Sequence, residues 1–178
     1  MTLFPDQSKQ ILEGLLLCAS DPISAKELGQ ILDMDSREVQ VLLGAMKESY
    51  RQENRGFALT EVAGGWCLTT LPEHAGFIEK LVKPRWSILS QASAEVLAIV
   101  AYRQPVTRSE IEEIRGVNCD SALGTLLERD LIEEKGRKEA PGRPILFGTT
   151  TEFLKCFGLV SLKHLPPIQS NNQQILPL

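Results

Sequence analysis

The residue types that most often do chemistry are few in this chain, and their spacing forms no familiar catalytic or metal-binding pattern. Zinc sites draw their ligands from closely spaced cysteine and histidine pairs, but the four cysteines here lie far apart and the two histidines have no such neighbour. These six residues are Cys18, Cys67, Cys119, Cys156, His74 and His164. We therefore expect no metal site and no disulfide, and the cysteines to be small core or partly buried thiols.

Paired carboxylates occur at Glu112-Glu113 and at Glu133-Glu134. Adjacent residues on a helix or strand do not face one site, so these pairs favour exposed charge over general acid–base catalysis. The chain also lacks the G-x-S-x-G, P-loop, G-x-G-x-x-G and H-E-x-x-H patterns. The sequence thus predicts a protein that is not an enzyme, with no catalytic residues and no cofactor.

A cluster of basic residues between positions 135 and 143 is the most distinctive polar feature. It contains four basic residues, Lys135, Arg137, Lys138 and Arg143, and one acidic residue, Glu139. The residues that we select as a partner-binding surface are Arg137, Lys138 and Arg143 from this cluster, together with Arg103 and Arg115 from outside it. Such a loop can bind phosphates non-specifically, bind an acidic protein surface, or simply be solvated. Pro141, Gly142 and Pro144 favour a fixed loop shape and hence a specific role.

The elements that position this loop follow a recognisable order from Ser90 to Gly158. The pattern predicts a helix, a short strand, two helices, a strand, the basic loop and a second strand, which is the order of a winged-helix domain. A capping box at Thr107–Glu110 starts the second helix. Another at Thr149–Glu152 starts a last helix that contains Phe153.

The first half of the chain repeats this order at an offset of 83 residues, so that Ser24 corresponds to Thr107 and Glu27 to Glu110. Residues 7–20 form the first predicted helix. A second helix begins at Ser24 and is expected to bury Leu28, Ile31 and Leu32. Strands at 57–62 and 66–71 meet across Gly64-Gly65, a hairpin turn. A helix at 72–83 leads out, with Phe77, Ile78, Leu81 and Val82 as its apolar positions.

The third helix of the first unit, capped by Asp35, carries an apolar stripe from Val39 to Tyr50. A helix this long in so small a unit can extend beyond its own core, and a protruding apolar face is usually covered by a partner. We therefore expect a homodimer through the N-terminal domain, with Leu42, Met46 and Tyr50 in the interface.

Charge argues against a protein that recognises DNA by its bases. The 178 residues carry a net charge of −4, and the two candidate recognition helices begin with acidic residues, whereas major-groove recognition uses Arg, Lys, Asn or Gln. No apolar run approaches the roughly 20 residues of a membrane span, and we see no signal peptide, so we expect a cytoplasmic protein. Two functions stay open: a protein-binding adaptor and a winged-helix DNA-binding transcriptional regulator.

Several motifs between 89 and 166 resemble those of a known family. They are Leu89–Gln91, Ile99–Arg108, Ile114–Asn118, Gly136–Pro144, Phe147–Thr150, Glu152–Leu154, Phe157–Leu159 and Leu162–Pro166. Together they resemble the bacterial segregation and condensation protein B (ScpB) family, and the N-terminal half agrees in order and length. Cys119 and Gly124 stand where we expect other residues, and neither would break the fold.

The resemblance implies a mainly α fold with small β-hairpins, arranged as two tandem winged-helix domains. The N-terminal domain, 1–83, would dimerise; a linker, 84–89, would follow; the C-terminal domain, 90–166, would contact the kleisin ScpA; and a tail, 167–178, would be disordered. ScpA would connect the dimer to the SMC ATPase in chromosome condensation and partition during cell division. DNA contact would be indirect or weak, no membrane would be involved, and the protein would be associated with the nucleoid.

Overall fold

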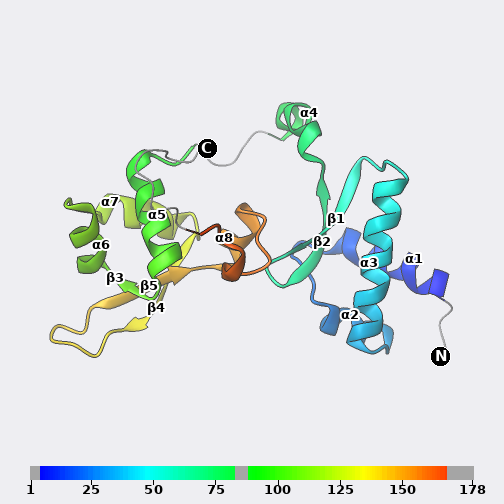
Figure 1. The fold of residues 1–178 in the computed structure, drawn as a ribbon, viewed down its shortest axis with the longest axis horizontal. Coiled ribbons are helices and arrows are strands. Elements are labelled where there is room, and N and C mark those ends of the chain that lie inside the picture. The colour runs from blue at the N-terminus through cyan, green and yellow to red at the C-terminus, as the bar shows by residue number, and fades with distance from the viewer. Residues whose placement is uncertain (1–4, 83–87, 168–178) are drawn as a thin grey trace.

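The computed structural model describes residues 5–82 and 88–167, which form two winged-helix domains that lie side by side (Figure 1). The N-terminal domain contains α1 (Pro5–Cys18), α2 (Ala25–Leu32), α3 (Ser36–Gln52), β1 (Phe57–Val62), β2 (Gly65–Thr70), η1 (Pro72–His74) and α4 (Ala75–Leu81). The C-terminal domain contains α5 (Gln91–Arg103), β3 (Val106–Thr107), α6 (Arg108–Arg115), α7 (Asp120–Glu128), β4 (Ile132–Arg137), β5 (Ile145–Thr149), α8 (Thr151–Cys156) and η2 (Leu162–His164). The predicted order of elements is confirmed in both.

The helices of the N-terminal domain begin where short polar side chains can accept from free backbone amides. The Ser24 hydroxyl accepts from the amide of Glu27 at 3.2 Å, which is the serine half of the predicted capping box. The Asp35 carboxylate accepts from the amide of Arg37 at 2.8 Å. Ile23 forms an isolated antiparallel bridge with Trp66, so the short strand expected at this point is present as a single bridge.

The core of the N-terminal domain lies between α1, α2, α3 and the inner face of the hairpin. Its buried members are Leu12, Leu16, Leu28, Leu32, Val39, Leu43, Met46, Tyr50, Leu59 and Trp66. The prediction that Ile31 is buried was wrong, since its side chain is 55% exposed. Ile31 lies one residue before Leu32, roughly 100° around the helix, and of the two only Leu32 is turned into the core.

The sheet of the C-terminal domain has the strand order β3–β5–β4, and all its pairings are antiparallel. The capping box at the start of α6 is complete: the Thr107 hydroxyl accepts from the Glu110 amide, and the Glu110 carboxylate accepts from the Thr107 amide. The core between this sheet and α5–α8 includes Val96, Val100, Ile111, Leu126, Ile132 and Phe153.

The cap of the last helix differs from the prediction by one residue. Thr149 is still in β5, where it pairs with Ile132, and its amide donates to the side-chain oxygen of Gln104 at 2.8 Å. Thr150 is the residue that caps α8, because its backbone is extended and its hydroxyl accepts from the Phe153 amide at 3.1 Å. Strand pairing across the sheet thus decided which of two adjacent threonines became the cap.

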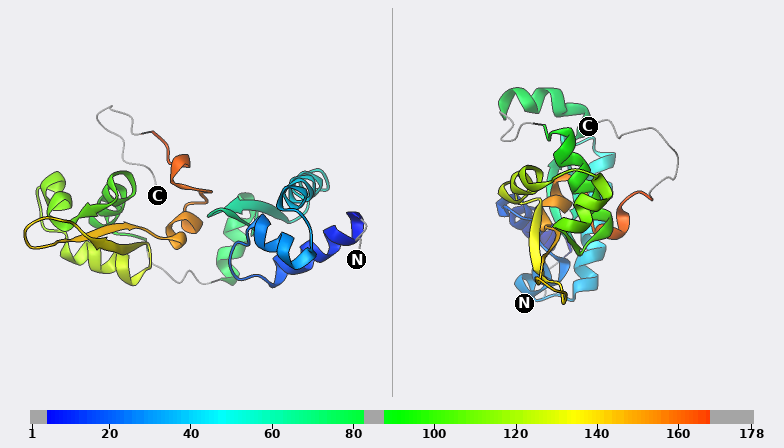
Figure 2. Two further views of the ribbon diagram at one scale, coloured as in Figure 1. Left: turned by 90° about the horizontal axis from the view of Figure 1, so that it is seen from below. Right: turned by 90° about the vertical axis from the view of Figure 1, so that its left-hand side faces the viewer.

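The two domains touch through the turn of the first hairpin and the end of α8 (Figure 2). The Ala63 amide donates to the Leu159 carbonyl at 2.8 Å, and the Lys155 ammonium forms an ion pair with Asp21 at 2.7 Å. Most of the predicted linker, 84–89, and all but the first residue of the predicted tail, 167–178, lie outside the described residues.

Candidate partner-binding surfaces

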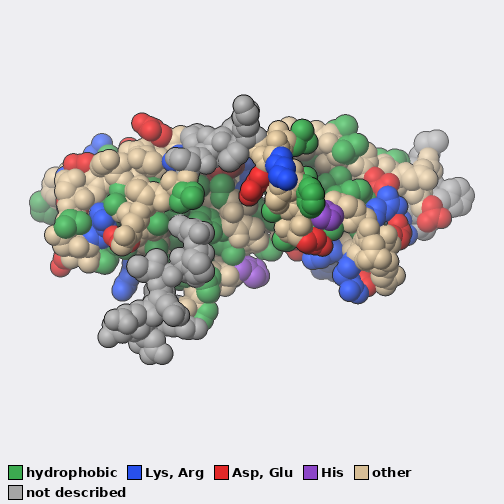
Figure 3. All heavy atoms as spheres, turned by 90° about the horizontal axis from the view of Figure 1, so that it is seen from above, with side chains coloured by type: hydrophobic (Ala, Val, Ile, Leu, Met, Phe, Trp, Pro, Cys, Tyr) green, Lys and Arg blue, Asp and Glu red, His purple; other side chains and the backbone are tan. Residues whose placement is uncertain are grey.

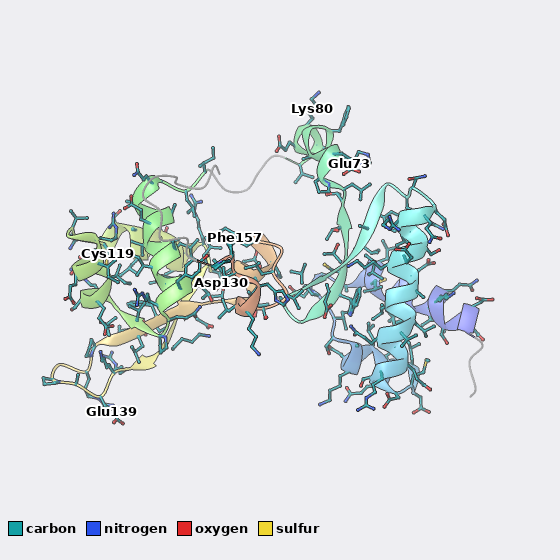
Figure 4. All side chains as sticks on the ribbon, in the orientation of Figure 1. Glu73, Lys80, Cys119, Asp130, Glu139 and Phe157 are labelled. Atoms are coloured by element: carbon teal, nitrogen blue, oxygen red, sulfur yellow. The ribbon has the colours of Figure 1, made fainter. Side chains whose placement is uncertain are left out.

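The loop between β4 and β5 is the wing of the C-terminal domain, and its own backbone holds its shape. The Lys138 amide donates to the Pro144 carbonyl, and the Arg143 amide to the Ala140 carbonyl, both at 2.9 Å. Gly142 has a φ of 80°, a conformation in which glycine carries no steric cost. Figure 4 shows Glu139 in this loop, pointing away from the rest of the domain. The wing is therefore an ordered projection.

Lys138 fastens the wing to the helix-turn-helix. Its ammonium donates to the Glu110 carboxylate at 2.6 Å, and that carboxylate also accepts from the amide and hydroxyl of Thr107. The Lys138 hydrogen bond, followed by those from Thr107, lowers the pKa of Glu110 from 4.5 to about 2. Wing and helix start are thus joined through one carboxylate.

The structure divides the five predicted basic residues into two groups. Arg115 is structural: its side chain is 9% exposed and donates to the Glu95 carboxylate at 3.1 Å. Lys138 is committed to Glu110. The other three are exposed to solvent: Arg137, whose guanidinium donates to the Arg143 carbonyl at 3.1 Å, Arg143 itself and Arg103.

Arg103, at the C-terminal end of α5, forms no ion pair or hydrogen bond through its side chain within the part of the chain that the structure describes. Of the five selected residues, Arg103, Arg137 and Arg143 therefore carry the positive charge that is exposed and outside ion pairs. The sequence alone placed all five basic residues in one group, because it does not show which of them have intramolecular partners.

The face of α6 and α7 that a DNA-binding protein would turn to the major groove carries neutralised charge. Arg108 forms ion pairs with both Glu112 and Asp120, so this cation, where the two helices meet, is matched by two carboxylates. Base recognition requires free donors at such positions. The geometry therefore agrees with the sequence in disfavouring base-specific recognition.

The predicted dimer residues lie largely inside their own domain. Met46 is 2% and Tyr50 5% exposed, and the Tyr50 hydroxyl donates to Glu13 at 2.7 Å. Leu42 is half-buried and packs against the same core. A dimer contact through these three side chains stays a prediction, but only Leu42 has appreciable surface left to offer a second copy.

A different part of the N-terminal domain is uncovered. No residue of α4 is buried, and Phe77 is 74% and Leu81 83% exposed. Figure 3 views the molecule from the side toward which α4 projects, and hydrophobic side chains lie open to solvent there. The sequence showed the apolar pattern of this helix, but a stripe does not reveal whether the same chain covers it.

Beside the root of α4 lies a groove of about 380 Å³. Its walls are the second half of α3, the start of β1 and the segment that leads to α4. The residues that line it are Gly44, Lys47, Glu48, Tyr50, Arg51, Asn54, Arg55, Phe57, Ala58, Leu59, Thr60, Leu71 and Glu73.

Within the ranges 5–82 and 88–167, no group of three or more metal-ligating side chains is arranged around a common point. In the same ranges, no helix combines the length and hydrophobicity needed to cross a bilayer. The four cysteines are free thiols, and burial raises the pKa of Cys67, Cys119 and Cys156.

Two winged-helix domains in tandem, with surfaces suited to contacts between macromolecules, define a class of adaptor proteins. Within it, the chain belongs to the family "Segregation and condensation complex subunit ScpB", whose model matches residues 10–168. The chain is thus a non-enzymatic subunit of a chromosome segregation and condensation complex. Of the two functions that the sequence left open, the adaptor is confirmed.

Similar proteins cover nearly the whole chain. The segregation and condensation protein B of Symbiobacterium thermophilum is 50% identical over 95% of this chain and 77% of its own length. That of Desulforamulus reducens is 49% identical over 94% and 92%.

Solved structures of the family are also similar to this chain. The crystal structure of ScpB from Mycobacterium tuberculosis is 36% identical, with a TM-score of 0.45, over 89% of this chain and 99% of that one. A dimer of an ScpB N-terminal domain complexed with an ScpA peptide is 32% identical, with a TM-score of 0.41, over 43% and 96%.

Proposed function

We propose that this chain acts as a homodimer that binds the kleisin ScpA, and through it the SMC ATPase, with the wing as part of the ScpA contact. A related N-terminal domain is described as a dimer with an ScpA peptide, and the same kinds of partner fit a chain of this family. The place of action would be the nucleoid, in the cytoplasm.

The observation that carries the placement on the wing is its preformed, basic shape. The Lys138–Glu110 contact and the internal backbone bonds order the loop before any partner arrives. A loop already in its bound shape loses little conformational entropy on binding. Arg137 and Arg143 are exposed on it beside a single acidic residue, Glu139. An acidic segment of ScpA fits this surface through complementary charge.

The test reverses the two wing charges that form no ion pair within the part of the chain that the structure describes. The variant Arg137→Glu with Arg143→Glu leaves Lys138 and its contact with Glu110 intact. Its affinity for the central region of ScpA, measured by isothermal titration calorimetry, should fall at least about tenfold. The matched control, Lys26→Glu with Arg37→Glu, changes the net charge equally on exposed positions of the N-terminal domain and should bind as the wild type does.

If the wing variant keeps wild-type affinity for ScpA, the wing is not part of the contact. If it binds ScpA normally but loses affinity for duplex DNA, with a shallower dependence on salt, then the wing serves DNA instead. Either result would remove the wing from the ScpA surface and leave the family assignment unchanged.

A further inference from the structure

Helix α4 is a seven-residue element that has no core of its own to rest on. Its turns contact η1, from which it starts, and none of its side chains is buried. An isolated helix of fewer than about 12 residues is marginal in water, because few hydrogen bonds offset the cost of nucleation. The apolar side chains Phe77, Leu81 and Val82 are all exposed. A covering surface would stabilise this helix.

The chain's own groove is poorly placed to provide that cover. Thr70, the last residue of β2, pairs with Phe57, and only residues 71–74 separate it from α4. This segment is itself ordered, since the His74 amide donates to the Leu71 carbonyl at 3.0 Å. Figure 4 shows Lys80 on α4 pointing away from both domains. In the structure α4 is directed outward, and no residue of α4 lines the groove.

The groove and the helix nevertheless begin at the same place. Leu71 and Glu73 line the groove and also form the segment from which α4 leaves. A two-fold axis near this segment would bring the outward helix of each copy to the groove of the other. A two-fold interface uses one surface patch on both subunits, and this patch contains both a projecting element and a recess.

The polar residues of the two elements are also complementary. Lys47 lines the groove and Glu79 lies on α4, and neither side chain has an ion-pair partner among the residues that the structure describes. The groove walls are otherwise a mixture of apolar side chains, such as Phe57, Leu59 and Leu71, and stems of charged ones. The recess can therefore receive an apolar helix that carries a carboxylate.

We infer that α4 is a dimerisation arm, which docks into the α3–β1 groove of a second copy of this chain while the second copy's arm docks in return. This inference rests on the homodimer of the proposed function and says which surface forms it. Phe77 and Leu81 would be the anchors, and Glu79 would meet Lys47 of the other subunit's groove at the edge. Leu42, Met46 and Tyr50 would then support the groove from inside.

Dilution experiments test the arm directly. In Phe77→Glu with Leu81→Glu, the dissociation constant of the dimer, measured by analytical ultracentrifugation, should rise at least about 100-fold, because buried apolar anchors dominate interface energies. The matched control Val41→Glu alters a side chain on α3 that is 71% exposed and does not line the groove. It should change the constant less than about threefold. Below the dissociation constant of the dimer both variants should melt like the wild type, since at higher concentrations loss of the dimer itself lowers the melting temperature.

Cross-linking shows whether the exchange is between copies. A Cβ at Gly44, in the groove, meets nothing within 4 Å, so Gly44→Cys should fold. Protein with Gly44→Cys is mixed with protein carrying Leu81→Cys, both with Cys18, Cys67 and Cys156 changed to Ser, and treated with a short bis-maleimide. A cross-linked pair that contains one chain of each kind is expected.

The outcomes separate this inference from the function on which it rests. A wild-type dimer that survives Phe77→Glu with Leu81→Glu unchanged, or that gives no mixed cross-link, overturns the arm and leaves the homodimer standing. A doubly substituted Gly44→Cys and Leu81→Cys chain that cross-links only within itself would show α4 in its own groove, and also overturns it. A wild-type protein that stays monomeric at all concentrations overturns both.

Discussion

The two winged-helix domains follow one order of elements but differ in the length of the third helix and of the loop that joins the last two strands. In the N-terminal domain α3 runs for 17 residues and two residues, Ala63 and Gly64, join the strands of the hairpin. In the C-terminal domain α7 has nine residues and the hairpin extends into the basic wing. The N-terminal domain is thus shaped for a groove and an arm, and the C-terminal domain for a charged projection.

The comparison indicates that the two repeats share the core positions of the winged-helix unit and differ in the third helix and the hairpin loop, which form different surfaces. At the 83-residue offset, Leu28 corresponds to Ile111 and both are fully buried. Gly65 and Gly148 are both buried glycines in the last strand of their sheets, but Gly65 begins β2 beside the turn whereas Gly148 lies near the end of β5, far from the wing. The equivalent core positions are therefore under the same physical demand, whereas the two glycines differ in their surroundings, so variants at both kinds of position can test how far the likeness extends.

The largest effects are expected from the two equivalent core positions. Leu28→Ala and Ile111→Ala should each lower the free energy of unfolding by about 3 kcal/mol, through lost burial and the cavity that remains. Trp66 fluorescence reports on the N-terminal domain once Trp86, which lies outside the described residues, is replaced by Phe. If the domains unfold separately, Leu28→Ala should shift the urea transition of this signal. Ile111→Ala should move only the circular-dichroism transition of the other domain. Equal shifts of the Trp66 signal would mean that the domains unfold together.

Alanine substitutions at Gly65 and Gly148 should differ in their stability cost, because the atoms next to the two glycines differ in how easily they can move. A Cβ at Gly65 would lie 2.7 Å from the backbone carbonyl carbon of Pro22, whereas at Gly148 it would meet the flexible side chains of Gln104 and Lys135 at 2.8 Å. Gly65→Ala should cost about 2–3 kcal/mol and Gly148→Ala about 1 kcal/mol, the range of overpacked cores. Thermal melts of both variants test this; the reverse order would contradict the assigned neighbours.

The capping box should make the stability of the C-terminal domain depend on pH in acid. Because the pKa of Glu110 is about 2 in the folded protein, below its ordinary value of 4.5, its stabilisation is present above about pH 4.5. It is lost as the pH falls toward 2. Lys138→Met removes the largest cause of the shift, so the variant should lose stability less steeply between these pH values.

Acid denaturation followed by circular dichroism measures that slope. Lys135→Met is the matched control, since Lys135 pairs with Glu133 and not with Glu110, and it should keep the wild-type slope near pH 3. In the same series, Thr107→Ala should cost about 1 kcal/mol at neutral pH, as expected for a lost N-cap. Equal slopes for both lysine variants would show that the wing lysine does not control Glu110.

The smallest effect is expected at the contact between the domains. Asp21 is largely exposed and pairs with Lys155 at 2.7 Å, so Asp21→Asn should change the free energy of unfolding by less than about 0.5 kcal/mol. The contact instead restrains orientation. The distance distribution between spin labels on the two domains should broaden in Asp21→Asn, and in the wild type at high salt. An unchanged distribution would show that other contacts set the angle.

Local patterns predicted much of this molecule, because their causes lie within three or four residues. The Thr107–Glu110 box, the Asp35 cap and the turn after Val62 each join near neighbours, and all formed close to the expected positions. The choice of Thr150 over Thr149 as a cap already depended on a strand partner distant in the chain. Boundaries shifted wherever pairing across the sheet competed with the local pattern.

The sequence by itself determined the order of the elements, the repeat of the winged-helix unit, the family and the existence of a basic wing. Only the tertiary structure decided which charges are free. Arg115 pairs with Glu95, which lies 20 residues away in the sequence, and Lys138 pairs with Glu110, which lies 28 residues away. It also buried Met46 and Tyr50 and left α4 uncovered. The physical reason is that the sequence specifies the chemical type of each side chain and the local pattern around it, whereas the residue with which that side chain interacts depends on how elements distant in the sequence pack together.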